Sequence, residues 1–142
     1  MRVVVDASCL VAAALPQHEH HRATLADLGR RRTVGHTLIM AAHALLEAYA
    51  VLTRLPPPHR LAPADASAIL DRTWGPSESV ALTATETWRV LRHHGAAGLP
   101  GGRVYDGVIG ACAQKAKADE LLTWNLRHFA DLRGVRAVTP IA

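Results

Sequence analysis

Short runs of apolar, β-branched residues alternate with helical patterns along this chain, and that alternation restricts it to a small set of folds. Residues 3–6, Val-Val-Val-Asp, have the composition of a buried strand, and a helical pattern at 9–15 follows and ends at Pro16. Strands that alternate with helices predict an α/β sandwich, in which helices cover both faces of a mainly parallel sheet. Further short strands are expected at residues 33–36, 79–82, 121–123 and 135–138.

Proline and capping signals mark where several helices begin or end. Pro63 suits the first turn of a helix. Thr83 and Glu86 have the Thr-x-x-Glu spacing of a capping box, which predicts a helix that ends at Gly95. The remaining helices are expected at residues 20–31, 38–55 and 106–118. A chain of 142 residues without a repeat or an evident linker predicts one domain over residues 1–142.

The composition favours a protein of the cytoplasm. Cys9 and Cys112 both lie in apolar helical patterns and give no disulfide framework, which fits a reducing compartment. Asp6 interrupts the first apolar run too early for a secretory signal. The longest apolar run, at 38–52, contains a histidine and a glutamate and is shorter than the ~20 residues of a membrane span. We therefore expect no membrane partner.

The chain is basic, with 16 Lys and Arg against 12 Asp and Glu and a formal net charge of +4. A basic surface around an acidic pocket suits a polyanionic substrate, because the surface attracts phosphate while the pocket holds a cation. An Arg-rich codon bias would give the same net charge, so charge alone does not decide the substrate.

Two aspartates follow strand or loop signals at points where a ligand site is expected. Asp6 comes directly after the first strand, and ligands of parallel sheets bind at the carboxyl ends of the strands. Asp106 follows a glycine-rich loop at the start of a helix. Each aspartate has an alternative interpretation as the cap of the helix that follows it.

Glu47 is the only carboxylate between residues 38 and 53, and its neighbours in the sequence are mostly Leu, Ala and Val. An ionised carboxylate on such a helix is costly unless it is paired or binds a metal. His43, one turn earlier, offers a structural Glu–His pair as the alternative. We interpret Glu47 as a metal ligand.

Four segments carry a resemblance to a known family. They are Val3-Val-Val-Asp-Ala-Ser8, the helical Glu47, the segment around Asp106, and Leu121-Leu-Thr-Trp-Asn-Leu-Arg-His-Phe129. In this order and spacing they resemble the PIN-domain ribonucleases, and within them the VapC-type toxins of bacterial VapBC toxin–antitoxin pairs. The resemblance spans almost the whole chain. It implies a PIN-like three-layer α/β/α fold whose sheet gathers acids around Mg²⁺ or Mn²⁺.

The resemblance also implies a role for individual residues. The fourth acidic position of the family falls on Asn125, where many members have Asp, and this departure puts a second metal ion in doubt. The implied catalytic residues are Asp6, Glu47, Asp106 and Asn125, of which the first three are the metal ligands. The implied residues that orient substrate or water are Ser8, Thr123 and Arg103.

The function that follows is a metal-dependent endoribonuclease that is the toxin of a type II toxin–antitoxin pair. It would hydrolyse RNA phosphodiester bonds with a cation-activated water, and its partners would be RNA, a small VapB-like antitoxin and a second copy in a homodimer. The alternatives are an RNA-processing PIN nuclease without antitoxin and a catalytically silent PIN-like module that binds RNA or protein. An aspartyl phosphatase would need an acid two residues after Asp6, where Ser8 stands.

Other polar and aromatic clusters have simpler interpretations. The histidines at 18, 20 and 21 and the arginines at 30–32 are expected to be solvated helix ends. Trp74 and Trp88 are expected in the core. Trp124 lies beside the predicted site, where its ring is available to stack on a base.

Overall fold

A computed structural model describes residues 1–141 of the chain. The elements are β1 (Arg2–Val5), α1 (Ala7–Ala14), α2 (His21–Thr33), β2 (Thr37–Ala41), α3 (Ala42–Arg54), α4 (Pro63–Trp74), β3 (Glu78–Val80), α5 (Ala84–Ala97), α6 (Arg103–Lys115), β4 (Glu120–Leu122), the 3₁₀ helix η1 (Leu126–Phe129) and β5 (Arg136–Val138).

The five strands form one sheet in the order β3-β2-β1-β4-β5, and every neighbouring pair is parallel. The α/β class with a parallel sheet is therefore confirmed. The chain builds the sheet outward from β1 in one direction and then returns to add β4 and β5 on the other side. The carboxyl ends of β1 and β4 lie at this reversal, which is where open α/β sheets form a ligand crevice.

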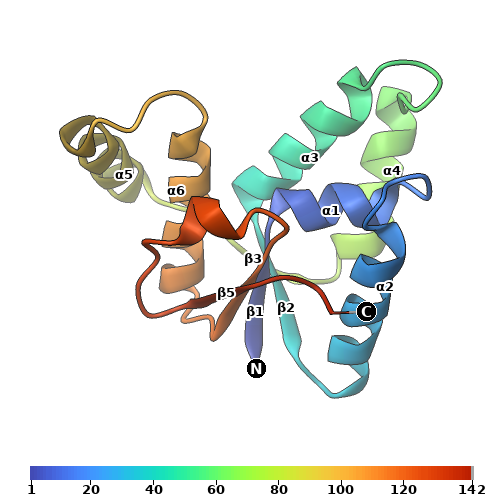
Figure 1. The fold of residues 1–142 in the computed structure, drawn as a ribbon, viewed down its shortest axis with the longest axis horizontal. Coiled ribbons are helices and arrows are strands. Elements are labelled where there is room, and N and C mark those ends of the chain that lie inside the picture. Colours follow the sequence, from blue (N-terminus) through green and yellow to red (C-terminus); the bar gives the residue numbers. More distant parts are fainter. Residues whose placement is uncertain (142) are drawn as a thin grey trace.

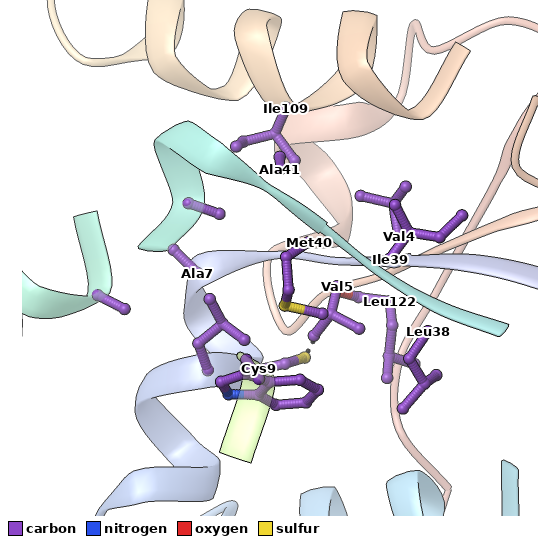
Figure 2. Packing of buried hydrophobic residues seen from close by; sticks show 14 of the residues in the cluster. Val4, Val5, Ala7, Cys9, Leu38, Ile39, Met40, Ala41, Ile109 and Leu122 are labelled. Atoms are coloured by element: carbon purple, nitrogen blue, oxygen red, sulfur yellow. Dashed lines mark hydrogen bonds between the residues drawn. The ribbon is translucent and has the colours of Figure 1, made fainter. Parts of the chain in front are cut away.

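Helices cover both faces of the sheet, as Figure 1 shows. Helices α1, α2 and α4 lie on one side of the strands and α5 and α6 on the other, while α3 rises from the end of β2. Val4 and Ile39 point to the same side as Ile109 of α6, whereas Val5 and Met40 point to the side of Cys9 (Figure 2). This alternation follows the two-residue period of a strand and explains why β1 is apolar at every position after Arg2.

The second strand lies further along the chain than the pattern predicts. A strand at 33–36 and a helix from 38 are wrong: α2 continues to Thr33, β2 covers Thr37–Ala41, and α3 begins only at Ala42. The reason is burial, since Ile39 and Met40 are fully enclosed between two helical layers. A strand buried on both faces has a continuous apolar sequence, which does not differ from that of a buried helix.

The helix signals are confirmed at two starts and corrected at one end. Pro63 opens α4, and Thr83 and Glu86 form the reciprocal capping box at the start of α5. The stop at Gly95 is wrong, because α5 runs through it to Ala97. Gly98 caps the helix with a left-handed φ of 66°, a conformation that costs a glycine little.

The two tryptophans expected in the core differ in their exposure. Trp74 is buried and lies under the guanidinium of Arg32, as expected. Trp88 is 54% exposed, so its placement in the core is wrong. Helix α5 is the outermost helix of its layer and buries Val90. Trp88, two residues earlier, lies about 200° around the helix from Val90 and therefore faces away from the layer beneath.

The basic end of α2 is not a solvated face. The Arg31 side chain is 4% exposed and bridges two carboxylates, with Nε 2.6 Å from Asp27 and Nη1 2.7 Å from Glu120 at the start of β4. Arg30 pairs with Asp27, and Arg136 with Glu120, at the exposed ends of the network. A buried ionic network of this kind joins helix α2 to the amino-terminal ends of β4 and β5.

The thiols of Cys9 and Cys112 are buried and free, as expected. Within residues 1–141, the helices are all too short or too polar for a membrane crossing.

Arg31→Met should lower the free energy of unfolding by about 3 kcal/mol, because it leaves two buried carboxylates with only the exposed guanidiniums at the ends of the network to balance them. Urea unfolding measures the loss. The matched control is Arg30→Gln, since Arg30 pairs with the same Asp27 from an exposed position and should cost less than about 1 kcal/mol. Equal losses in the two variants would contradict this account of the network.

Candidate active site

Asp6 stands at the carboxyl end of β1, where its backbone N–H donates to the carbonyl of Leu122 over 2.9 Å and extends the pairing of β1 with β4. The residue is 3% exposed. Although Asp6 occupies the N-cap position of α1, its carboxylate makes no capping hydrogen bond. Oδ2 instead accepts hydrogen bonds from the hydroxyls of Ser8 and Thr123, each at 2.8 Å. The capping interpretation therefore does not describe this carboxylate.

The two hydroxyls connect Asp6 to the segment that follows β4. Ser8 Oγ accepts the backbone N–H of Trp124 at 3.0 Å, and Thr123 Oγ1 accepts that of Asn125 at 2.9 Å. Each hydroxyl thus receives a hydrogen bond from the backbone and donates one to the carboxylate. The loop after β4 and the acid at the end of β1 are consequently held as one unit.

Glu47 projects from α3 toward the same region. Burial, reinforced by the negative charges of Asp6 and Asp106, raises the pKa of the Glu47 carboxyl to about 7. His43 Nε2 lies 3.1 Å from Glu47 Oε1 but is not aligned for a hydrogen bond. Burial also lowers the pKa of His43, so the imidazole is neutral near pH 7 and does not balance the Glu47 charge. The Glu–His pair is therefore a contact and not an ion pair at that pH.

Asp106 lies in the first turn of α6, three residues after the start of that helix at Arg103, and is not its N-cap. Its Oδ2 is 3.2 Å from Nδ1 of His128 in η1. Burial raises the pKa of the Asp106 carboxyl, the charge on His128 opposes that rise, and Asp6 adds to it. Asp106 therefore experiences the charge of Asp6 although the two acids come from different elements.

A cavity of about 720 Å³ collects most of the predicted residues. Asp6, Glu47, Asp106 and Asn125 line it. Ser8 also lines it, and Thr123 is fully buried behind Asp6. The cavity lies where β1, α3, α6 and the loop after β4 meet, at the reversal of the strand order.

Arg103 is not part of that cavity. It lines a second cavity of about 780 Å³ between α5, α6 and η1. The two cavities share Asp106, which is therefore the wall between them. The positive charge of Arg103, like that of His128, opposes the rise in the pKa of Asp106. The structure does not bring Arg103 together with Asp6 or Glu47.

Several residues of the first cavity are not expected from the sequence. Glu19 adds another carboxylate at its edge, and Arg54 and Tyr105 also line it. His18 and His20 lie at the start of α2, as expected, but they also form part of the cavity wall and are not simply a solvated helix end. They belong to the turn between α1 and α2, and only the folding of the chain brings this turn beside the acids.

The donor atoms of the cavity suit a hard divalent cation. Both donors to Asp6 bind Oδ2, so Oδ1 has no hydrogen-bond donor among residues 1–141. In the part of the chain described, no three His, Cys, Asp or Glu side chains are close enough to enclose an ion by themselves. Mg²⁺ keeps several water ligands and needs direct contact with only one or two carboxylates. Carboxylate oxygens that lie apart around a cavity, where the charge of Asp6 contributes to the raised pKa values of Glu47 and Asp106, therefore fit such an ion.

Comparison with known proteins agrees with this architecture. The family described as PIN domain matches residues 3–134. Ribonuclease VapC40 of Mycobacterium tuberculosis is 42% identical over 125 residues, which are 88% of this chain and 87% of that protein.

Solved structures with the same fold have low sequence identity. A structure of VapBC2 from Rickettsia felis bound to a promoter DNA fragment matches with a TM-score of 0.71 and 17% identity, over 98% of both chains. The Mycobacterium tuberculosis toxin VapC20, described as cleaving the sarcin–ricin loop, matches with a TM-score of 0.71 and 15% identity, over 94% of this chain and 98% of that one.

The raised pKa of Glu47 predicts how stability changes with pH in EDTA. Because the folded-state pKa of about 7 lies above the ordinary 4.5, the folded protein binds more protons than the unfolded one between these values. The free energy of unfolding should therefore fall as pH rises from about 4.5 to 7. Glu47→Gln should remove this fall and gain about 2 kcal/mol over the parent between pH 5 and pH 8, after allowance for solvent screening.

Urea unfolding at the two pH values measures this gain. The control is Glu19→Gln, an exposed carboxylate at the edge of the same cavity, which should retain the pH dependence of the parent. An unchanged pH dependence in Glu47→Gln would show that Glu47 is not the destabilising charge.

Proposed function

This chain belongs to the PIN-domain family, and we propose that it is a metal-dependent endoribonuclease that uses Mg²⁺ or Mn²⁺. The observation that carries the proposal is the convergence of Asp6, Glu47 and Asp106, from three separate elements, on one cavity at the reversal of the strand order. The 42% identity to a protein named a ribonuclease supports the reaction class. The basic net charge of +4 supports a polyanionic substrate.

Each residue has a task in this reaction that its surroundings support. Asp6, Glu47 and Asp106 would hold the cation, and Asn125 offers an amide oxygen without charge. When bound, the cation supplies positive charge to the phosphate and activates water for attack on phosphorus. Ser8 and Thr123 fix Asp6 through hydrogen bonds, which holds one ligand in place before the cation arrives. Arg103, in the adjoining cavity, would bind a phosphate further along the RNA.

We also propose that the enzyme is the toxin of a toxin–antitoxin pair in the cytoplasm and forms a homodimer. The fold is that of chains in solved VapBC assemblies, including one bound to promoter DNA. A cavity with several carboxylates is complementary to a basic side chain, and a small antitoxin of VapB type would close the site by inserting one.

Asp6→Asn and Asp106→Asn should each reduce Mg²⁺-dependent RNA cleavage to background and relieve growth arrest on expression, because each removes a charge that holds the cation. In EDTA both variants should be at least as thermally stable as the parent, since carboxylates that repel one another lose one member. Cleavage of total RNA, followed by sequencing of the new ends, measures the first effect and identifies the target.

The control for these variants is Asp65→Asn, an exposed aspartate in the first turn of α4, which should cleave at the parental rate. Retained cleavage in Asp6→Asn would show that the acid is not catalytic. A metal-free Asp6→Asn protein that melts well below the parent would show that the residue is mainly structural.

Asn125→Asp should lower the Mg²⁺ concentration at half-maximal cleavage severalfold. The substitution adds a negative oxygen ligand beside the three carboxylates proposed to hold the cation, and the affinity for a hard cation rises with ligand charge. Titration of activity with Mg²⁺ and calorimetric titration of the metal-free protein measure the change. Asn125→Ala serves as the control, and an Asp variant that requires as much Mg²⁺ as the Ala variant would contradict a ligand position at residue 125.

A further inference from the structure

Three aromatic rings form one part of the wall of the acidic cavity. The imidazole of His20 stacks on the indole of Trp124, with ring centroids 3.8 Å apart and ring planes 9° from parallel. His18 approaches His20 at 5.7 Å with its plane tilted by 44°. All three residues line the cavity that contains Asp6, Glu47 and Asp106. A flat aromatic surface is therefore part of the same hollow as the carboxylates.

The stack is held in place by hydrogen bonds on both of its members. Trp124 Nε1 donates to Thr24 Oγ1 at 2.9 Å, and that hydroxyl donates to the carbonyl of His20 at 2.7 Å. The His20 N–H in turn donates to Nδ1 of His18 at 3.0 Å. The indole is thus anchored to the first turn of α2, and the backbone of His20 is held at both its N–H and its carbonyl, so the imidazole starts from a fixed point beside the indole.

The same stack is linked to the acids through the backbone of Trp124. This N–H donates to Ser8 Oγ, and Ser8 donates to Asp6. Two hydrogen bonds therefore separate the aromatic ring pair from the carboxylate at the end of β1. A nucleotide whose phosphate lies at the acids would have its base within reach of the rings.

The position of His20 in the stack decides which ring faces a ligand. Trp124 covers one face of the imidazole, whereas the His20 side chain as a whole remains 36% exposed. The indole is therefore not free on that side to receive a base, and the imidazole stands in front of it. Aromatic faces of this kind bind nucleobases by stacking, with little dependence on the base.

We propose that His20, backed by Trp124, is a nucleobase-binding platform for the nucleotide beside the scissile phosphate. This inference rests on the proposed ribonuclease function and adds a residue that positions the RNA strand. His20 takes no part in the chemistry at phosphorus. Its role is to bind the flat face of a base so that the adjacent phosphate is presented to the acids.

The test separates an aromatic face from mere packing with two variants of similar volume, His20→Leu and His20→Phe. Both are made in a Glu47→Gln background, in which cleavage is blocked without disturbing the hydrogen bonds around Trp124. Binding of a fluorescein-labelled single-stranded RNA is measured by anisotropy. The RNA is compared with a set of copies in which one base at a time is replaced by an abasic ribose.

In the Glu47→Gln protein, the loss of one particular base should weaken binding about tenfold, within the range measured for stacking on a side chain. His20→Phe should retain this sensitivity, and His20→Leu should reduce it to less than about twofold because the leucine has no aromatic face. His59 lies outside both cavities, so His59→Ala should leave the abasic profile, the affinity for each RNA copy with one missing base, unchanged. A structural role alone would weaken all the RNAs equally.

A second measurement does not depend on the folding of the leucine variant. In the Trp88→Phe, Glu47→Gln protein, Trp74 is buried in the core, so a change in tryptophan emission on RNA binding reports Trp124. Intact RNA should change this emission, and RNA abasic at the sensitive position should not.

Equal abasic profiles in the leucine and phenylalanine variants, or equal emission changes with the two RNAs, would overturn the platform and leave the ribonuclease assignment intact. Failure of the parent chain to cleave and to bind any RNA would overturn the proposed function, and the platform with it.

Discussion

The position of the Asp6 carboxylate is the constraint on which the rest of the site depends. Asp6 follows the central strand of the sheet, its N–H continues the pairing with β4, and two hydroxyls fix its side chain. Because Val3, Val4 and Val5 are fully buried and β1 is paired on both sides, the backbone that carries the acid is fixed relative to its neighbours. The other carboxylates lie near this fixed charge, and burial together with the negative charges of Asp6 and Asp106 raises the pKa of Glu47.

Local sequence signals were sufficient for the features that depend on local structure. The apolar run before Asp6 predicts a strand, and the charge of Glu47 in an apolar helix indicates that its environment must compensate it. The capping box of Thr83 and Glu86 is read directly from the spacing of two residues. The parallel sheet follows from the alternation of such elements, so the fold class and the approximate positions of the acids are predictable.

The features that the sequence did not predict depend on long-range contacts. The sequence of β2 would also suit a buried helix, and its place between two helical layers makes it a strand. Arg31 is buried because it pairs with Glu120, 89 residues away. His20 lies in the cavity wall because Trp124 arrives beside it from the far end of the chain. No window of sequence contains these pairs. Arg103 illustrates the opposite case, since it is near Asp106 in sequence yet does not line the cavity that contains Asp6.

The division of the molecule into two hollows with Asp106 between them has a consequence for inhibition. A small molecule in the cavity between α5, α6 and η1 would contact His128 and Asp106 from behind, without entering the cluster of carboxylates. It would therefore need no metal-chelating group, and it would compete with the RNA only for the phosphate site proposed at Arg103, outside the acidic cavity. A ligand that does not resemble a nucleotide could thus contact the carboxylate that both cavities share.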